Sequence, residues 1–405
     1  MSRHFTDWLK GFTDFASVGE APIKFYFWTG VSTVAGALRR RVWFDMGHFR
    51  WTPNFYIILV APPGVVSKTT TIDIGRRLLV KIPGVNLGPD ALTWQSLVQT
   101  LGKITEIVLL SDGSKFEMSA ITIFSGELGT MLDPKDRPMV DALVALWDAR
   151  DRFEKTSKTR GDDILVNPWL NIIACTTPSW IAEHMPEYMA GGGLMSRCIF
   201  LYSDQKDKFV AYPQLVLPPT FHDTREKLLL DLNEIASLKG PFHMTNEAFH
   251  WGEAWYREHW AGQGSSSDPQ YAGYRARKQT HLHKLAMVMS AAKRSTLEIT
   301  VEDLVISEAM LLALEKDSMR VFSNVGLTQD SRGQNELLEV LRKFGDASKR
   351  KVFAHLIKHL TWAQFERAVE SCIKAGEIQQ IKVGDDYLLQ AKGHGKPHSL
   401  LSTDE

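Results

Sequence analysis

The chain has 405 residues, more than a single hydrophobic core usually holds, so two or three domains are expected. Lys plus Arg and Asp plus Glu both number 47, which excludes an overall basic field, so any nucleic-acid binding must come from local patches. Cys175, Cys198 and Cys372 form no CxxC pair, which argues against a zinc site or a disulfide framework and favours a reducing, cytoplasmic location.

The first 60 residues are predicted to form a helix, a short hairpin and a buried strand. Residues 22–40 are mostly apolar, which favours a helix, and residues 42–51 have the pattern of a hairpin. The run NFYIILV at 54–60 predicts a buried strand. The amphipathic segment 1–15 is unlike a signal peptide, and no apolar run approaches the roughly 18 residues of a membrane span, so no membrane partner is expected.

The segment APPGVVSKTTT at 61–71 follows this strand and has most features of a phosphate-binding loop. Such a loop needs small residues whose backbone N–H groups converge on phosphate oxygens, a Lys for charge, a hydroxyl for Mg²⁺ and a helix behind it. Gly64 supplies flexibility, Lys68 the charge and Thr69 the Mg²⁺ hydroxyl, and residues 69–80 have helical spacing. The predicted nucleotide-binding residues are Pro63, Gly64, Val65, Val66, Ser67, Lys68, Thr69 and Thr70.

The amino-acid sequence of this loop departs from the usual pattern of a phosphate-binding loop. Counting back from Lys68, the positions of the two glycines hold Pro62 and Ser67. Ser67 still lets a phosphate approach closely, but it tolerates a positive φ poorly. Two alternatives therefore remain open: a loop that is lengthened by one residue, and a chance SKTT at the start of a helix.

Acidic and polar residues follow two further predicted strands, and we expect their side chains to lie beside the loop. ITIFSGELG places Glu127 after a buried strand, where a phosphate-loop ATPase needs a carboxylate to polarise water. The Asp that usually precedes this Glu is replaced by Gly126, and the alternative is a strand-end Glu on a turn. LNIIACTTP ends in Thr176 and Thr177, and we expect Thr177 to reach the γ-phosphate, the alternative being two turn-forming threonines.

A fourth strand follows the glycine-rich turn in GGGLMSRCIFLY. Arg197 precedes this strand, and in ring ATPases an Arg at such a place points into the nucleotide of the neighbouring subunit, where it stabilises transition-state charge. The alternative is an Arg that pairs within its own subunit. Helical patterns at 90–102 and 135–151 separate the strands, so the sequence predicts an α/β fold whose parallel sheet is covered on both faces.

Beyond this predicted core, the composition changes near 214–220. Residues 216–325 are nearly all helical in pattern and are expected to form a lid, which leaves 1–215 as the core with its N-terminal helical segment. Residues 335–391 follow the order helix, helix, helix, hairpin, which is that of a winged helix. The tail 392–405 is expected to be disordered.

The chain resembles the P-loop ATPases of the replicative-helicase type that phages and plasmids encode, across roughly residues 5–203. The shared pattern is an apolar N-terminal helix with FYFW, the strand that begins PNFY, the loop, GELG and TTPSW. SRC before a strand is similar to the arginine-finger motifs of clamp loaders and of MCM-type helicases. YRARKQTHLHKLAM resembles the lid of the MCM-type helicases.

This resemblance implies a RecA-like or AAA+ P-loop core in a hexameric ATPase that moves on single-stranded DNA during phage or mobile-element replication, with ATP and Mg²⁺ as cofactors. It implies that Arg197 acts in trans on a neighbour's nucleotide, and it places the sensor arginine of the lid at Arg277. It also implies a hairpin before the third strand, with Lys155, Lys158 and Arg160 facing a DNA channel. Replication proteins are further expected partners.

Two other functions remain open. One is a loader or remodeller that uses ATP to act on a protein partner. The other is a nucleotide-gated binding switch that scarcely hydrolyses ATP, which Gly126 and Ser67 would suit. DNA-stimulated ATP turnover favours the translocase, and tight ATP binding without turnover favours the switch.

Overall fold

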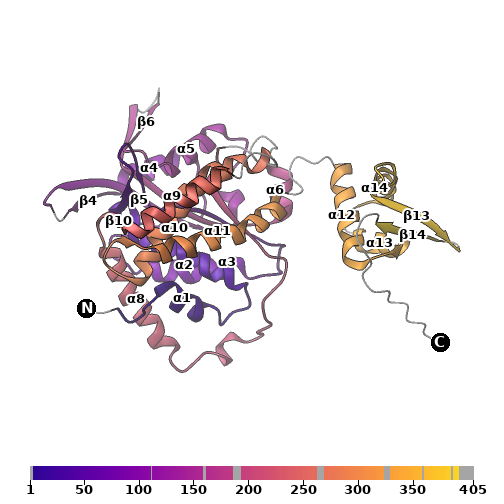
Figure 1. The fold of residues 1–405 in the computed structure, drawn as a ribbon, viewed down its shortest axis with the longest axis horizontal. Coiled ribbons are helices and arrows are strands. Elements are labelled where there is room, and N and C mark those ends of the chain that lie inside the picture. The colour runs from indigo at the N-terminus through magenta and orange to yellow at the C-terminus, as the bar shows by residue number, and fades with distance from the viewer. Residues whose placement is uncertain are drawn as a thin grey trace. The chain divides into compact units, whose positions relative to one another are not determined.

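The computed structural model contains two compact units, residues 1–325 and 326–405, which are described separately (Figure 1). Both units contain helices and strands, so the predicted α/β class is confirmed, with sheets that mix parallel and antiparallel pairs. The described residues are 3–110, 112–157, 161–185, 193–261, 269–322, 329–357, 360–384 and 386–391.

The first unit is built around a five-stranded sheet with the order β4-β5-β8-β3-β9. Strands β5, β8, β3 and β9 run parallel to one another, as predicted. β4 pairs antiparallel with β5 and is an addition to the predicted sheet at its edge. The bounds are β3 Tyr56–Val60, β4 Thr105–Leu109, β5 Lys115–Ser125, β8 Pro168–Thr176 and β9 Cys198–Tyr202.

Helices cover both faces of this sheet, because successive strand residues point to opposite faces and both sets are apolar. In β3, Ile57 and Leu59 pack with the helices of one face, whereas Tyr56, Ile58 and Val60 pack with those of the other. The first face is covered by α1 Trp8–Ala16, α2 Ile23–Leu38, α3 Lys68–Leu79, α8 Phe221–Ser237, α10 Pro269–Lys293 and α11 Val301–Phe322, and the second by α4 Trp94–Lys103, α5 Arg137–Trp147 and α6 Pro178–His184. Short 3₁₀ helices occur at η1 Arg39–Arg41, η2 Leu128–Thr130, η3 Met195–Arg197 and η4 Pro213–Leu215.

A four-stranded sheet with the order β11-β10-β1-β2 joins the N-terminal hairpin to the segment expected as a lid. β1 pairs antiparallel with β2, as predicted, and parallel with β10. Leu232 of α8 and Leu285 of α10 belong to the same hydrophobic core as α2. Residues 216–325 thus include strands and share a core with the preceding segment. The bounds are β1 Val42–Asp45, β2 Arg50–Trp51, β10 Gly240–Met244, α9 Asn246–Ala261 and β11 Glu298–Ile299.

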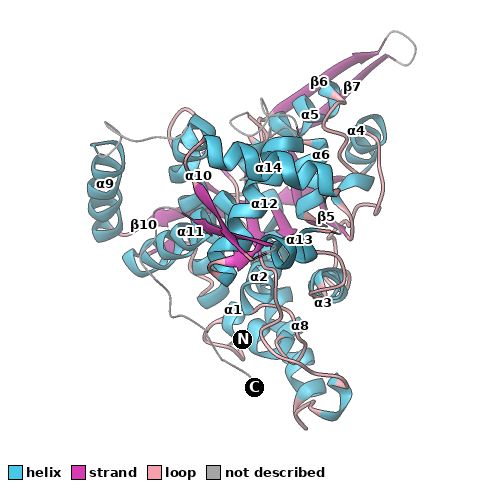
Figure 2. Ribbon diagram, turned by 90° about the vertical axis from the view of Figure 1, so that its right-hand side faces the viewer, coloured by secondary structure: helices cyan, strands magenta, loops and turns pink. Residues whose placement is uncertain are grey.

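An antiparallel hairpin of β6 Arg152–Ser157 and β7 Gly161–Val166 lies between α5 and β8, at the place that the resemblance implies. Figure 2 shows this hairpin projecting from the helices of the first unit. Lys155 belongs to β6, but its side chain lies outside the described residues, as do Lys158 and Arg160.

The described residues of the second unit form three helices and a three-stranded antiparallel sheet, with the order β12-β14-β13, around an apolar core of their own. Leu341, Phe365 and Val369 belong to this core. The order of the elements agrees with the helix, helix, helix, hairpin pattern of 335–391, with a short strand added before the second helix. The bounds are α12 Gln329–Phe344, β12 Ala347–Ser348, α13 Lys349–Leu356, α14 Trp362–Lys374, β13 Ile378–Val383 and β14 Asp386–Ala391.

Candidate functional site

The loop 61–67 lies at the carboxyl edge of the parallel strands, between β3 and α3. Val60 at the end of β3 pairs with Thr176 at the end of β8, and Ala61 N donates a hydrogen bond to Thr176 O at 3.3 Å. Gly64 has a φ of 72°, a conformation that favours glycine, and the chain turns there toward the helix. The strand, loop and helix predicted for this segment are therefore all present.

The helix α3 begins at Lys68, whose N–H donates a hydrogen bond to Val66 O at 2.9 Å, and the amides of Thr69 and Thr70 follow it. Ser67 O accepts hydrogen bonds from Thr71 N at 3.0 Å and Thr71 Oγ1 at 2.8 Å, but within the described residues the Ser67 side chain makes no capping bond. Thr69 and Thr70 are exposed, and their N–H groups belong to the first turn, which has no partner inside a helix. Together with the helix dipole, these amides favour an anion.

Lys68 places a half-buried cation at this loop. Its Nζ donates a hydrogen bond to Ala61 O at 2.7 Å. Burial lowers the pKa of Lys68, whereas the negative forms of Cys175 and Glu127 raise it. The ammonium is thus held by a neutral carbonyl, which a phosphate oxygen can replace with a stronger, charge-assisted bond.

The end of β5 lies against the first turn of α3. A Cβ on Gly126 would lie 3.2 Å from Thr69 Cγ2 and 3.7 Å from Thr69 Oγ1, so the position that lacks the usual Asp faces the predicted Mg²⁺ hydroxyl. Glu127 follows and is exposed, and its carbonyl accepts hydrogen bonds from Ser125 Oγ and Thr130 Oγ1, both at 2.8 Å. Two adjoining elements therefore bring Thr69 and Glu127 to one edge of the sheet.

The donor set at this edge fits Mg²⁺. The Thr69 hydroxyl and the Glu127 carboxylate are hard oxygen ligands, and Mg²⁺ usually keeps several waters and substrate phosphates. Throughout the part of the chain that the structure describes, no group of three or more His, Cys, Asp or Glu side chains could hold a metal ion. The residues thus suit a Mg²⁺ ion that arrives with a phosphate ligand.

Thr177 lies at the same edge and caps a helix. Its Oγ1 accepts a hydrogen bond from Trp180 N at 3.2 Å and lies 3.0 Å from Ser179 Oγ. The preceding Thr176 is buried, and among the described residues its Oγ1 has no hydrogen-bond partner. Of the two predicted threonines, Thr176 rather than Thr177 thus has the hydroxyl that is not already engaged.

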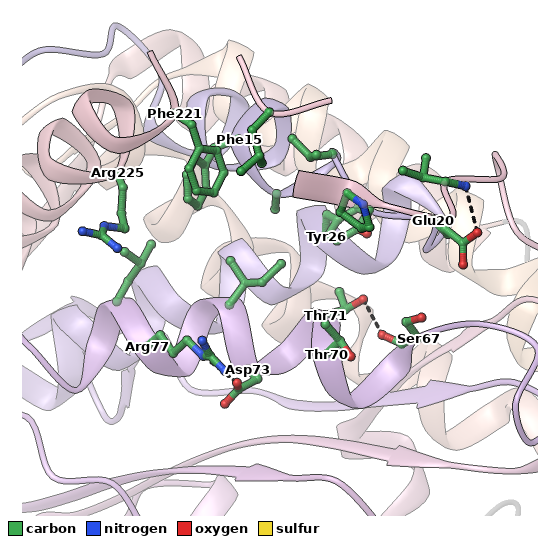
Figure 3. Close-up of a pocket in the computed structure, with 18 of the residues that line it drawn as sticks. Phe15, Glu20, Tyr26, Ser67, Thr70, Thr71, Asp73, Arg77, Phe221 and Arg225 are labelled. Atoms are coloured by element: carbon green, nitrogen blue, oxygen red, sulfur yellow. Dashed lines mark hydrogen bonds and ion pairs between the residues drawn. The ribbon is translucent and has the colours of Figure 1, made fainter. Parts of the chain in front are cut away.

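A cavity of about 620 Å³ opens beside the first turn of α3 (Figure 3). Ser67, Thr70 and Thr71 line one end of it. Phe15 and Phe221 line another part, with their rings stacked at a centroid distance of 4.6 Å. The cavity is therefore continuous with the loop and mostly apolar away from it.

The lining of this cavity could not be found from local sequence patterns. It comes from three segments that are far apart in the sequence, 15–26, 67–81 and 210–225. Tyr26 from the first segment is buried, which raises the pKa of its hydroxyl. Neither Phe15 nor Phe221 belongs to a recognisable motif, so only the packing of α1, α3 and α8 brings them together.

Arg197 lies at the opposite edge of the sheet from the loop. It precedes Cys198, which pairs with Tyr56 at the start of β3, about 13 Å along the strand from Val60 at its end. The buried Arg197 guanidinium makes a bidentate ion pair with Asp148, with Nε–Oδ1 at 3.0 Å and Nη2–Oδ2 at 2.8 Å. Arg197 is thus buried and paired within its own chain, which agrees with the alternative to an arginine finger.

Arg277 belongs to the same cluster. Its Nε donates a hydrogen bond to Ser196 Oγ at 3.2 Å, and its Nη1 lies 3.7 Å from Asp148 Oδ1. Burial lowers the pKa of Arg277, and the neighbouring Arg197 lowers it further. Because this cluster lies at the amino edge of the parallel strands, the structure does not bring Arg277 to the loop of its own chain, as a lid sensor would require.

No protein-family model matches the chain, and no curated protein matches it. Within the described ranges, no helix has the length and apolar character that crossing a bilayer requires. The function of the chain therefore has to be inferred from the geometry of its own residues.

Proposed function

We propose that the chain is an ATPase whose loop 61–70 binds the phosphates of ATP together with Mg²⁺. The observation that carries this proposal is the meeting of Lys68, Thr69 and Glu127 at the carboxyl edge of parallel strands, beside uncapped helix amides. Ligands of α/β sheets bind at this edge. In this proposal the first unit is a P-loop core of the RecA-like or AAA+ type.

Each group has a distinct part in this site. The Lys68 ammonium exchanges the Ala61 carbonyl for β- and γ-phosphate oxygens, and the Thr69 and Thr70 amides donate to the same phosphates. The Thr69 hydroxyl would hold Mg²⁺, and the ion would neutralise charge on the phosphates. Glu127 accepts the proton of the water that attacks the γ-phosphorus.

The cavity beside α3 suits the base and ribose of the nucleotide. Its volume of about 620 Å³ lies in the range of small-molecule sites. The stacked rings of Phe15 and Phe221 offer apolar surface for a base. Ser67 and Thr70 belong both to the loop and to the cavity wall, so a single ligand can contact both.

The loop assignment predicts that Lys68→Ala weakens ATP binding by about 10- to 100-fold or more, because the phosphates lose a charge-assisted bond. Isothermal titration calorimetry on the full chain measures this. Lys103→Ala is a matched control, since Lys103 is exposed in α4 on the other face of the sheet. An unchanged ATP affinity in Lys68→Ala would contradict the proposed site.

We also propose that the ATPase is a DNA helicase or translocase that acts on single-stranded DNA as a hexamer, with replication proteins as partners. What supports the DNA contact is the projecting hairpin β6–β7, whose sequence contains Lys155, Lys158 and Arg160. In this proposal the segment 216–325 acts as the lid and 335–391 as a winged helix. Arg197 and Arg277 are left out of the catalytic set, because both are engaged with Asp148.

Imaging of particles with and without an ATP analogue and single-stranded DNA tests this wider proposal. A ring that forms with the nucleotide and contains DNA in its channel is the expected result. Particles that remain monomeric under all of these conditions would contradict the hexamer, while the ATP site would remain testable by calorimetry.

Gly126 favours a second candidate function, a nucleotide-gated switch with little hydrolysis. A carboxylate at this position would lie beside the Thr69 hydroxyl, and glycine offers none. Glu127 then has to serve both the metal and the water. Tight ATP binding with negligible turnover, in the presence and absence of DNA, is the result that would favour the switch.

A further inference from the structure

A second cavity, of about 310 Å³, lies at the amino edge of the main sheet, at the Asp148 cluster and away from the loop 61–67. Strand β2 with its neighbouring residues, the end of α5 with the loop that follows it, and the helix α10 contribute to its wall. The residues that matter for its chemistry are Phe49, Trp51, Asp148, Arg150, Arg277 and Lys284.

This cavity has more positive than negative charge. Asp148 is the acidic residue of its wall, and it is already paired with Arg197. Arg277 lies 3.7 Å from the same carboxylate, and Lys284 Nζ donates to neutral oxygens that include Trp147 O at 3.2 Å. Two guanidinium groups therefore face one carboxylate, and Arg150 adds a third guanidinium to the wall, an excess of charge that a bound anion would neutralise.

The innermost amino group of the wall belongs to Lys284. Lys284 is 2% exposed, and its Nζ lies 3.6 Å from the ring centroid of Trp147. Burial lowers the pKa of Lys284 well below its usual range, Asp148 raises it, and Arg197 and Arg277 lower it. Trp147 Nε1 is also buried without a hydrogen-bond partner in the described part of the chain, so the wall has a further donor for a ligand.

The outer part of the cavity is aromatic and open to solvent. Phe49 is 52% exposed, and its ring centroid lies 5.6 Å from that of Trp51. Trp51 in turn packs against His283 at 4.8 Å, which holds the platform in place. Arg150 is exposed beside these rings. Aromatic faces next to cations are the means by which proteins hold single-stranded nucleic acids.

The wall residue Arg150 lies next to the base of the projecting hairpin in the sequence. Arg150 and Asp151 immediately precede β6, which begins at Arg152. Asp151 forms an ion pair with the buried Arg40 at 2.8 Å, which anchors the base of the hairpin to η1. A strand of nucleic acid that leaves the cavity past Arg150 would therefore meet the hairpin next.

We propose that this cavity binds a phosphodiester group of a single-stranded nucleic acid, with the adjacent base stacked on Phe49. The excess cations hold the phosphate, and the exposed ring holds the base without regard to sequence. A paired, stacked duplex presents no base face to Phe49, so a single strand is the form that fits. The inference rests on the proposed action on nucleic acid and not on the assignment of the ATP loop.

The phosphate contact is tested by fluorescence anisotropy of labelled oligo-dT with the full chain at several salt concentrations. Arg150→Glu should weaken binding by about tenfold or more and lower the salt slope by about one unit. Arg257→Glu is the matched control, since Arg257 is exposed on α9 and pairs there with Glu253. Equal losses in the two variants would overturn the proposal, because net charge alone would then explain them.

The stacking contact is tested separately at Phe49, which is exposed enough to be replaced without repacking a core. Phe49→Ala should weaken oligo-dT binding roughly 5- to 100-fold and leave the salt slope unchanged. Phe49→Trp should restore the affinity, because an indole also stacks on a base. Wild-type affinity in Phe49→Ala would overturn the proposal.

ATP binding measured in parallel separates this inference from the proposed ATPase. Arg150→Glu and Phe49→Ala should keep the wild-type ATP affinity, because the loop lies at the other edge of the sheet. Lost ATP affinity with normal oligo-dT binding would overturn the proposal and assign the cavity to a nucleotide phosphate. A chain that binds ATP but no oligo-dT would overturn this inference alone, and the reverse result would overturn the ATP loop alone.

Discussion

At position 126 the chain has a glycine beside the Thr69 hydroxyl. Because glycine offers no carboxylate, Glu127 is the residue that supplies one at this end of β5. Glu127 is exposed and follows the end of β5, and the negative charge of its carboxylate raises the pKa of Lys68. A water between Glu127 and a bound γ-phosphate would therefore have one protein carboxylate to accept its proton. The rate of hydrolysis should depend on this residue much more than ATP affinity does.

Glu127→Gln is expected to retain ATP binding while hydrolysis falls by about 10²- to 10⁴-fold, because the amide keeps the size of the side chain but cannot accept the proton. Phosphate release measures the rate, and calorimetry measures the affinity. Glu117→Gln, an exposed position on the same strand, should leave both unchanged. Hydrolysis at the wild-type rate in Glu127→Gln would show that the base lies elsewhere.

Asp148→Asn is expected to lower the free energy of unfolding by about 3–5 kcal/mol, because it leaves the Arg197 side chain, which is 5% exposed, without its counter-charge. Urea unfolding measures the change. Asp223→Asn breaks the exposed pair with Lys227 and should lower it by under about 1 kcal/mol. If Arg197 turned instead to a neighbouring subunit, the two variants would have similar stability.

The helix α10 places two histidines in the core of the first unit. Its second half is buried, and Leu282, Leu285 and Val288 lie in the core of the first unit. His281 and His283 are buried in the same stretch, and burial lowers the pKa of His281 to about 3 and that of His283 to about 4. Both imidazoles are therefore neutral in the folded chain at neutral pH, and each is an acid-sensitive point of the fold.

The free energy of unfolding is expected to fall as the pH decreases from about 6.5 toward about 4. A histidine in the unfolded chain has a pKa of about 6.5, so over this range the unfolded state binds protons that the folded state does not. Well below pH 6.5 each histidine contributes a slope of up to about 1.4 kcal/mol per pH unit. Urea unfolding at pH 7, 6 and 5 measures the slope.

The variant His283→Phe should lower this slope by up to about 1.4 kcal/mol per pH unit, because it removes one histidine that takes up a proton on unfolding. The new ring can still pack between Phe44 and Trp51, so the fold should be kept. His48→Gln changes an exposed histidine and should leave the slope as it is. A stability that does not vary between pH 7 and pH 5 would show that neither imidazole resists protonation in the folded state.

At the scale of the whole molecule, the first unit is a single packed body. β10 adds to β1, and α8, α10 and α11 cover the same face of the main sheet as α2. Removing residues 216–325 would expose that face to water, at a cost of about 25 cal/mol for each Å² of apolar surface. The second unit has its own core.

A chain that ends at residue 325 is therefore expected to fold and to bind ATP with the full chain's affinity, whereas one that ends at 215 should not fold cooperatively. Circular dichroism during thermal unfolding and calorimetry with ATP measure these two outcomes. A cooperative transition and normal ATP binding in the chain that ends at 215 would show that residues 216–325 form an independent lid.

The strand, loop and helix at 54–80, the position of Glu127 after a strand and the order of elements in 335–391 could all be predicted from the sequence. Each depends on a local pattern: an apolar run covered on both faces, a loop of small residues before a helix, or helical spacing followed by a hairpin. These patterns act between residues close in the chain, so the sequence by itself determines them.

The tertiary structure alone decided the partner of Arg197, the lining of the two cavities and the pairing of β1 with β10. Arg197 and Asp148 are 49 residues apart, and the sequence is equally compatible with an Arg that faces a neighbouring subunit. The 620 Å³ cavity takes its wall from three separate segments. Which distant groups meet depends on how whole helices pack against the sheet, because a buried charge or ring pairs with whatever that packing brings within reach.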